Sequence, residues 1–184
     1  MNKILIKLIF AFILVLLFIS PVQAARDTDS FDGNIYPIYA GNGSLVPPAS
    51  TLEQSLKNKR TSVLVFYLDD STTSKVFAPV VSGIKLLWSS SIDIIPLTID
   101  DIQDRQSSDP NNASYYWRGK IPQTVVINPL GEVLFDKEGQ VPIEDINQAI
   151  SKATGKKPPD FKVNIKSYNE YNSEASKQGY TDPR

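Results

Sequence analysis

The sequence predicts an α/β domain, because strand-like apolar runs alternate with helical patterns through its middle. Residues 62–68 form a continuous β-branched and aromatic run, which is typical of a strand buried on both faces. Residues 73–89 carry apolar side chains at the spacing of one helix face, and residues 92–99 form a second strand pattern. This strand–helix–strand unit is the centre of the predicted domain.

The later part of the pattern predicts a β-hairpin and a closing helix. Strand patterns at residues 123–128 and 132–136 flank a Pro-Leu-Gly turn. Residues 143–150 then place apolar side chains at helical spacing, and Gly155 is suited to end that helix.

The earlier part of the pattern predicts an edge strand and a short helix. Residues 35–40 alternate Ile and Tyr around Pro37, which lacks the N–H that a central strand would need, so an edge position is expected. Ser50 and Glu53 have the spacing of a capping box and predict a helix that runs to about residue 59.

The composition excludes several classes of chemistry. The 184 residues include 19 basic and 20 acidic side chains, for a formal net charge of −1, with no cysteine and no histidine. Disulfides, thiolate catalysis, histidine-based triads and most zinc or haem sites are therefore excluded. A nucleic-acid partner is not expected, because the phosphate backbone requires a concentrated basic surface. We expect no catalytic residue, no metal and no cofactor.

The N-terminus has the features of an export signal. Lys3 and Lys7 precede an unbroken apolar run at residues 8–19, and residues 22–24 (Val-Gln-Ala) fit a peptidase site. The run is shorter than the roughly 20 residues that span a bilayer. An uncleaved anchor at residues 4–22 is the alternative, and either reading carries the rest of the chain across a membrane.

The start of the central helix has a motif that resembles thioredoxin. Residues 66–79 can be laid against the thioredoxin pattern Phe-Trp-Ala-x-Trp-Cys-Gly-Pro-Cys-Lys-x-x-x-Pro. Lys75 and the helix proline Pro79 fall in register. Ser71 and Ser74 stand where the two redox cysteines would be, so this chain lacks the thiolates that thiol–disulfide exchange requires.

A second motif strengthens the resemblance, which covers about residues 52–154. Residues 117–122 (Trp-Arg-Gly-Lys-Ile-Pro) are similar to the Arg-Gly-Ile-Pro-Thr segment of thioredoxins, with one inserted residue. The resemblance implies a three-layer α/β/α sandwich with a mixed sheet and a cis Pro122 beside the helix start. It also implies that the backbone of Ile121 pairs with an extended peptide. Alternatively, Pro122 only opens an edge strand.

The resemblance divides the chain into four parts. They are a signal peptide or uncleaved anchor (1–24), a loose leader (25–34), a thioredoxin-like domain (35–155) and a flexible polar tail (156–184).

The candidate site is a surface for a protein partner rather than a catalytic centre. Its residues are those at the helix start and around the second motif, namely Ser71, Thr72, Thr73, Ser74, Trp117, Ile121 and Pro122. Two alternatives remain open. Thr73 or Ser74 could simply cap the helix, or Ser71 could act as a nucleophile with Lys75 as its base. The second requires an unusual lysine, whereas Lys75 is expected to be solvated with an ordinary pKa near 10.4.

A narrower resemblance concerns function. A leader, a thioredoxin domain without cysteines and a polar tail are together similar to the lumenal thioredoxin-like proteins of cyanobacteria called thylakoid photosystem I accumulation factors. This resemblance implies a non-catalytic factor in the thylakoid lumen, on the lumenal side of the membrane, or in the periplasm. Its partners would be photosystem I subunits or assembly intermediates, with membrane association through the partner or an uncleaved leader. The alternative is a general exported peptide-binding or chaperone module.

Overall fold

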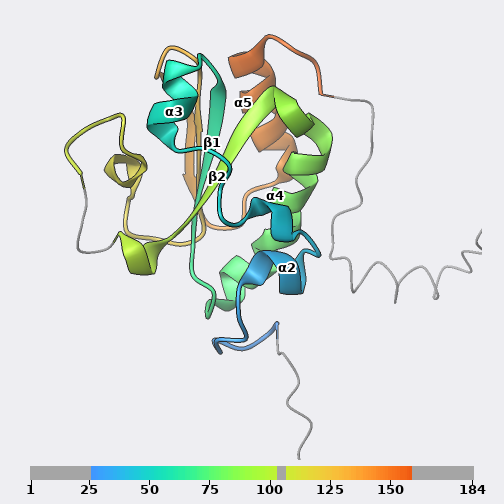
Figure 1. Cartoon of the computed structure of the whole chain (residues 1–184). Coiled ribbons are helices and arrows are strands. Elements are labelled where there is room, and N and C mark those ends of the chain that lie inside the picture. The colour runs from blue at the N-terminus through green and yellow to red at the C-terminus, as the bar shows by residue number, and fades with distance from the viewer. Residues whose placement is uncertain (1–25, 103–106, 159–184) are drawn as a thin grey trace, which may run out of the picture.

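A four-stranded mixed sheet forms the centre of the computed structural model, which describes residues 26–102 and 107–158 (Figure 1). The strand order is β2-β1-β3-β4. β1 pairs in parallel with β2 and antiparallel with β3, and β3 pairs antiparallel with β4. The strands are β1 (Thr61–Tyr67), β2 (Ile92–Thr98), β3 (Gln123–Ile127) and β4 (Val133–Glu138).

Helices cover both faces of this sheet (Figure 1). One apolar cluster unites α2, α4 and α5 with one face, and a second unites α3 and the 3₁₀ turn η4 with the other. The bounds are α2 (Ile35–Tyr39), α3 (Leu52–Lys57), α4 (Thr72–Trp88), α5 (Ile143–Thr154), η1 (Gly43–Leu45), η2 (Ser89–Ser91), η3 (Ile99–Asp101) and η4 (Ala113–Tyr116). This is the three-layer, thioredoxin-like α/β arrangement that the sequence predicts.

The central strand explains why two cores form. All seven residues of β1 are buried. Because successive side chains of a strand point to opposite faces, Val63 and Val65 belong to the first cluster, whereas Leu64 and Phe66 belong to the second. The continuous apolar run in the sequence is therefore a strand with helices on both sides.

The predicted edge strand at residues 35–40 is wrong, because this segment forms helix α2. The side chain of Asn34 accepts a hydrogen bond from the backbone N–H of Tyr36 at 3.1 Å and caps the helix. Pro37 lies in the first turn, where its missing N–H leaves no helical bond unmade. Ile35 and Tyr39 are buried in the first apolar cluster, which stabilises the short helix.

The predicted capping box of α3 is displaced by one residue. The hydroxyl of Thr51 accepts from the N–H of Gln54 at 3.2 Å, and the Gln54 side chain accepts from the N–H of Thr51 at 3.0 Å. Ser50 instead shares a hydrogen bond with the hydroxyl of Ser55, so its side chain is not the cap.

The ends of the chain are described only in part. The predicted signal peptide and nearly all of the predicted polar tail lie outside the described residues. Between residues 26 and 158, the described segments include no helix that is long and apolar enough to cross a bilayer. The predicted loose leader is described from residue 26, and residues 28–32 are hydrogen-bonded to α4 rather than loose.

Candidate functional site

Two of the four hydroxyl residues at the start of α4 bind the protein's own backbone. The carbonyl of Ser71 accepts the N–H of Lys75 at 2.9 Å, and its hydroxyl accepts the N–H of Ser74 at 3.4 Å. Ser71, rather than Thr73 or Ser74, is thus the residue with capping geometry. Ser74 is 1% exposed, and its hydroxyl accepts the N–H of Leu68 at 3.2 Å. Ser74 therefore ties the loop after β1 to the helix.

The first amide of α4 is occupied by a carboxylate from upstream. The backbone N–H and the hydroxyl of Thr72 both donate to Oδ1 of Asp29, each at 2.7 Å. Hydrogen bonding from Thr72, above all from its backbone N–H, lowers the pKa of Asp29. A carboxylate at this position is also favoured by the helix dipole. The hydrogen-bond acceptor for this amide is thus supplied by the protein itself.

The most unexpected feature of the site is the complete burial of Lys75. Its side chain is 0% exposed, and Nζ donates to the carbonyl of Thr28 at 2.9 Å, the carbonyl of Ser30 at 2.6 Å and the carboxylate of Asp32 at 2.7 Å. Nζ also lies 5.4 Å from the centre of the Tyr39 ring. The expectation of a solvated Lys75 is wrong, because residues 28–32 fold over it.

This burial also counts against the Ser71–Lys75 dyad. A general base needs a free lone pair, whereas the Lys75 ammonium is held by an ion pair and two carbonyls.

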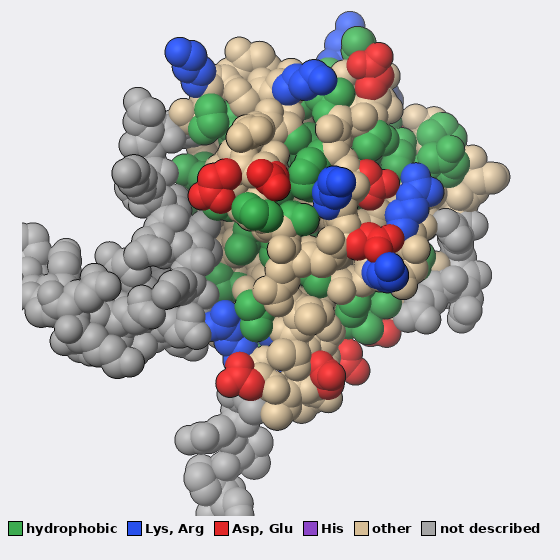
Figure 2. Space-filling model, turned by 180° about the vertical axis from the view of Figure 1, so that it is seen from behind, with side chains coloured by type: hydrophobic (Ala, Val, Ile, Leu, Met, Phe, Trp, Pro, Cys, Tyr) green, Lys and Arg blue, Asp and Glu red, His purple; other side chains and the backbone are tan. Residues whose placement is uncertain are grey.

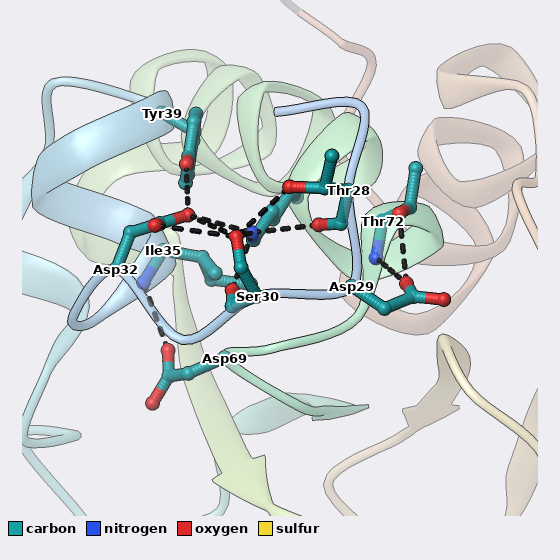
Figure 3. Close-up of polar contacts among 9 residues, drawn as sticks. Thr28, Asp29, Ser30, Asp32, Ile35, Tyr39, Asp69 and Thr72 are labelled. Carbon is teal, nitrogen blue, oxygen red and sulfur yellow. Dashed lines mark hydrogen bonds and ion pairs between the residues drawn. The ribbon is translucent and has the colours of Figure 1, made fainter. Parts of the chain in front are cut away.

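We call residues 28–32 the strap (Figure 3). Asp32 joins the strap to α2 as well as to α4, because its carboxylate also accepts from the Tyr39 hydroxyl at 2.6 Å. The hydrogen bond from Lys75, and then that from Tyr39, lowers the pKa of Asp32. Burial, followed by the nearby Asp32 carboxylate, raises the pKa of Tyr39 to about 12. The contacts of the strap are therefore polar and charge-assisted.

The residues of the second motif directly precede β3. The Ile121–Pro122 peptide bond is cis, and Pro122 is buried while Ile121 is half-buried. Trp117 packs on Phe66 with a ring separation of 5.5 Å. Leu68, Trp117 and Ile121 all pack against the second apolar cluster. Since Leu68 also bonds to Ser74, it connects the two predicted halves of the site.

Gln123 positions this second half, and it is not among the residues predicted from the sequence. Its buried amide donates to the carbonyl of Tyr116 at 2.8 Å and to the carboxylate of Asp136 at 2.7 Å. Its carbonyl oxygen accepts the N–H of Arg118 at 3.0 Å. A polar amide directly after Pro122, at the start of a strand whose last three residues are apolar, is the signal that could have found it.

Acidic side chains gather at the carboxyl ends of β1 and β2. Burial raises the pKa of Asp69, and Asp100 and Asp70 add to this effect, whereas a hydrogen bond from the N–H of Ile35 at 2.8 Å opposes it. Within residues 26–102 and 107–158, no group of three or more acidic, histidine or cysteine side chains is placed to hold a metal ion. We therefore assign no metal chemistry to these carboxylates.

Comparison with known proteins identifies a relative that is named as a thylakoid membrane protein. No family model matches the chain. The chain is 37% identical over 153 residues to thylakoid membrane protein slr1796 of Synechocystis sp. (strain ATCC 27184 / PCC 6803 / Kazusa), which covers 82% of this chain and 76% of that protein. The chain belongs to the slr1796 family.

A solved structure is similar to this member of the slr1796 family. It is a mutant thioredoxin from Halobacterium salinarum NRC-1, with 18% sequence identity and a TM-score of 0.45. The similarity covers 56% of this chain and 82% of that structure.

The surface of this slr1796 family member carries charges of both signs. Basic and acidic side chains are interspersed on the face opposite to the view of Figure 1 (Figure 2). This face does not present the concentrated basic stripe that a nucleic acid would require.

Proposed function

We propose that the protein is a non-catalytic, thioredoxin-like factor that binds a polypeptide partner and supports photosystem I accumulation. It would act on the lumenal side of the thylakoid membrane. The observation that carries this proposal is the use of Ser71 and Ser74, which replace the redox cysteines, as hydrogen-bond acceptors for their own backbone. The thylakoid relative supports the location, at 37% identity.

The state of the reactive groups supports a non-catalytic role. The hydroxyl of Ser74 is buried and hydrogen-bonded, and the ammonium of Lys75 is enclosed by the strap. An alcohol needs a neighbouring base to become a nucleophile. Without cysteine or histidine in the chain, the site offers hydrogen bonds and apolar contact instead.

The partner surface is best supported around the cis Pro122. Trp117 and Ile121 are half-buried and, like Leu68, pack against the second apolar cluster, so each keeps an accessible part next to the core. Aromatic side chains anchored in this way are the ones that commonly dominate binding energy at interfaces. The backbone of Ile121 is the position that the thioredoxin resemblance assigns to pairing with an extended peptide.

A deletion strain tests the photosynthetic role. We expect a lowered ratio of photosystem I to photosystem II, measured by low-temperature fluorescence and immunoblotting under several light regimes. Normal photosystem I content in every regime would contradict this role. A general exported peptide-binding module would then be the better description.

Photocrosslinking tests the proposed surface separately. A photoreactive amino acid at Ile121 should capture photosystem I subunits or assembly intermediates in isolated membranes. The matched control carries the same group at Gln148, which is exposed on α5. Equal capture from both positions, or none from Ile121, would reject this surface.

A further inference from the structure

We propose that the strap is an internal ligand that closes the α4 half of the site, and that the partner displaces it with a short acidic polypeptide segment. This inference rests on the proposed function and names the class of segment that the partner would use.

The strap shows which chemistry the site accepts. Lys75 is a fully buried cation whose acceptors include two backbone carbonyls, of Thr28 and Ser30, and one carboxylate, of Asp32. The carbonyls come from alternate residues of a short non-helical segment. A second carboxylate, from Asp29, lies on the first amide of α4. Two backbone carbonyls that converge on one ammonium, with carboxylates beside them, describe a bent acidic peptide segment.

The strap is held without apolar burial of its own. Thr28 and Asp29 are exposed, and the Phe31 side chain is 73% exposed. The contacts that we identify between the strap and the domain are hydrogen bonds and one ion pair, to Lys75, Thr72 and Tyr39. Contacts of this kind are exchangeable, because another segment that offers the same acceptors can satisfy Lys75 and the α4 amide equally well. A segment of the same chemistry can therefore exchange with the strap.

Displacement of the strap does not require α2 to unfold. Gly33 connects the two and has φ of +107°, a conformation that glycine adopts readily. Beyond it, α2 is fixed independently by the N–H of Ile35, which donates to Asp69, and by buried Tyr36 and Tyr39. The strap can thus swing about Gly33 while α2 keeps its place on α4.

Charge selects the partner segment. A basic segment would bring like charge to Lys75, whereas an acidic segment supplies the carboxylates that Lys75 and the α4 amide bind in the closed form.

The test uses the full chain with Asp29→Cys and Thr72→Cys. Because the chain has no other cysteine and the two side chains meet at 2.7 Å, oxidation should lock the strap in place. The probe is a fluorescent peptide with the sequence of residues 26–34, and the control peptide replaces the acidic residues at 29 and 32 by Asn. Binding is measured by fluorescence anisotropy, and circular dichroism checks the fold of both forms.

We expect the reduced double variant to bind the acidic peptide and the oxidised form to bind it at least about tenfold more weakly, because the disulfide prevents the strap from leaving α4. In the reduced form the strap is only a tethered, reversible competitor. The Asn control peptide should not bind either form. An Asp32→Asn variant, which weakens the strap without a thiol, should also bind the acidic peptide better than the unmodified chain does.

Equal binding by the oxidised and reduced forms, or equal binding of the two peptides, would overturn the proposal. So would failure of both folded variants to bind the acidic peptide. None of these results affects crosslinking from Ile121, so failure of the strap model and failure of the proposed function can be told apart.

Discussion

Lys75 and Asp32 form an ion pair of 2.7 Å between a fully buried lysine and a leader residue 43 positions upstream. The pair joins a segment outside the predicted domain to the helix that carries the redox motif in thioredoxins. Because a buried cation requires partners, the folded domain includes the strap. Its N-terminal boundary therefore lies before residue 28 rather than at residue 35.

Replacing Lys75 by methionine should destabilise the protein. Lys75→Met keeps the unbranched stem but leaves the carbonyls of Thr28 and Ser30 without their donor. We expect the free energy of unfolding in urea to fall by about 2 kcal/mol. Lys85→Met, on the same helix but only half-buried, is the matched control and should change it by less than about 0.5 kcal/mol. Equal stability of the two variants would contradict the role of Lys75.

Local periodicity in the sequence predicts the helices and strands whose structure depends mainly on residues nearby in the chain. β1, β2 and α4 lie within a residue or two of their predicted ranges, since each carries its own burial pattern. Residues 35–39 are different, because Pro37 suits an edge strand and a first helical turn equally well. The cap from Asn34 and packing against α4 favour the helix over the strand.

The geometry of the candidate site is harder to predict from the sequence than the fold is. The absence of cysteine is visible directly in the sequence, and it excludes chemistry by thiols of this chain. The burial of Lys75 depends on acceptors 43 to 47 positions upstream, and no local pattern reports such contacts. From the sequence alone, the charged residues of the leader are therefore predicted to be solvated. In the structure, two of them, Asp29 and Asp32, bind α4.

Acid should release the strap before it unfolds the domain. The pKa values of Asp29 and Asp32 are lowered from 3.8 in the folded state, so their stabilising contribution is present above that value. It is lost as the pH falls below 3.8 through the folded pKa values. A fluorophore attached at Phe31→Cys should report release in this window. Combined replacement of Asp29 and Asp32 by Asn should remove the transition, and its persistence would assign it to other groups.

Neutralising Asp69 should have the opposite dependence on pH. Its pKa is raised from 3.8, so its contribution to stability is present below that value and is lost as the pH rises through the folded pKa. Asp69→Asn keeps an oxygen to accept the N–H of Ile35 and removes a partly buried charge. We expect a higher melting temperature at pH 7 and no difference at pH 3. Asp70→Asn, at an exposed neighbour, should have a smaller effect at pH 7.

Removing the Ser74 hydroxyl should loosen the loop before α4. Ser74→Ala leaves the N–H of Leu68 without the acceptor that lies 3.2 Å away. The free energy of unfolding should fall by about 1–2 kcal/mol, and amide exchange at Leu68 should accelerate. Thr73→Ala, at the exposed neighbouring position, is the control and should leave that exchange rate unchanged. A faster rate in the control alone would assign the loop's stability to Thr73.

Gln123 should control the Trp117 half of the site. Gln123→Leu nearly preserves side-chain volume but removes the hydrogen bonds to the carbonyl of Tyr116, the N–H of Arg118 and the carboxylate of Asp136. Because buried polar groups lose partners, we expect a loss of about 3 kcal/mol in the free energy of unfolding. Crosslinking from Ile121 should also fall at temperatures where the variant is still folded, since Gln123 holds the segment that precedes Pro122.

The control for this last change is Gln148→Leu, an exposed position on α5. It should alter the free energy of unfolding by less than about 0.5 kcal/mol and leave crosslinking from Ile121 intact. If Gln123→Leu lowered stability while crosslinking stayed at the level of the control, Gln123 would support only the sheet. The partner surface would then depend on Trp117 and Leu68, which pack on Phe66 and its cluster without help from the amide.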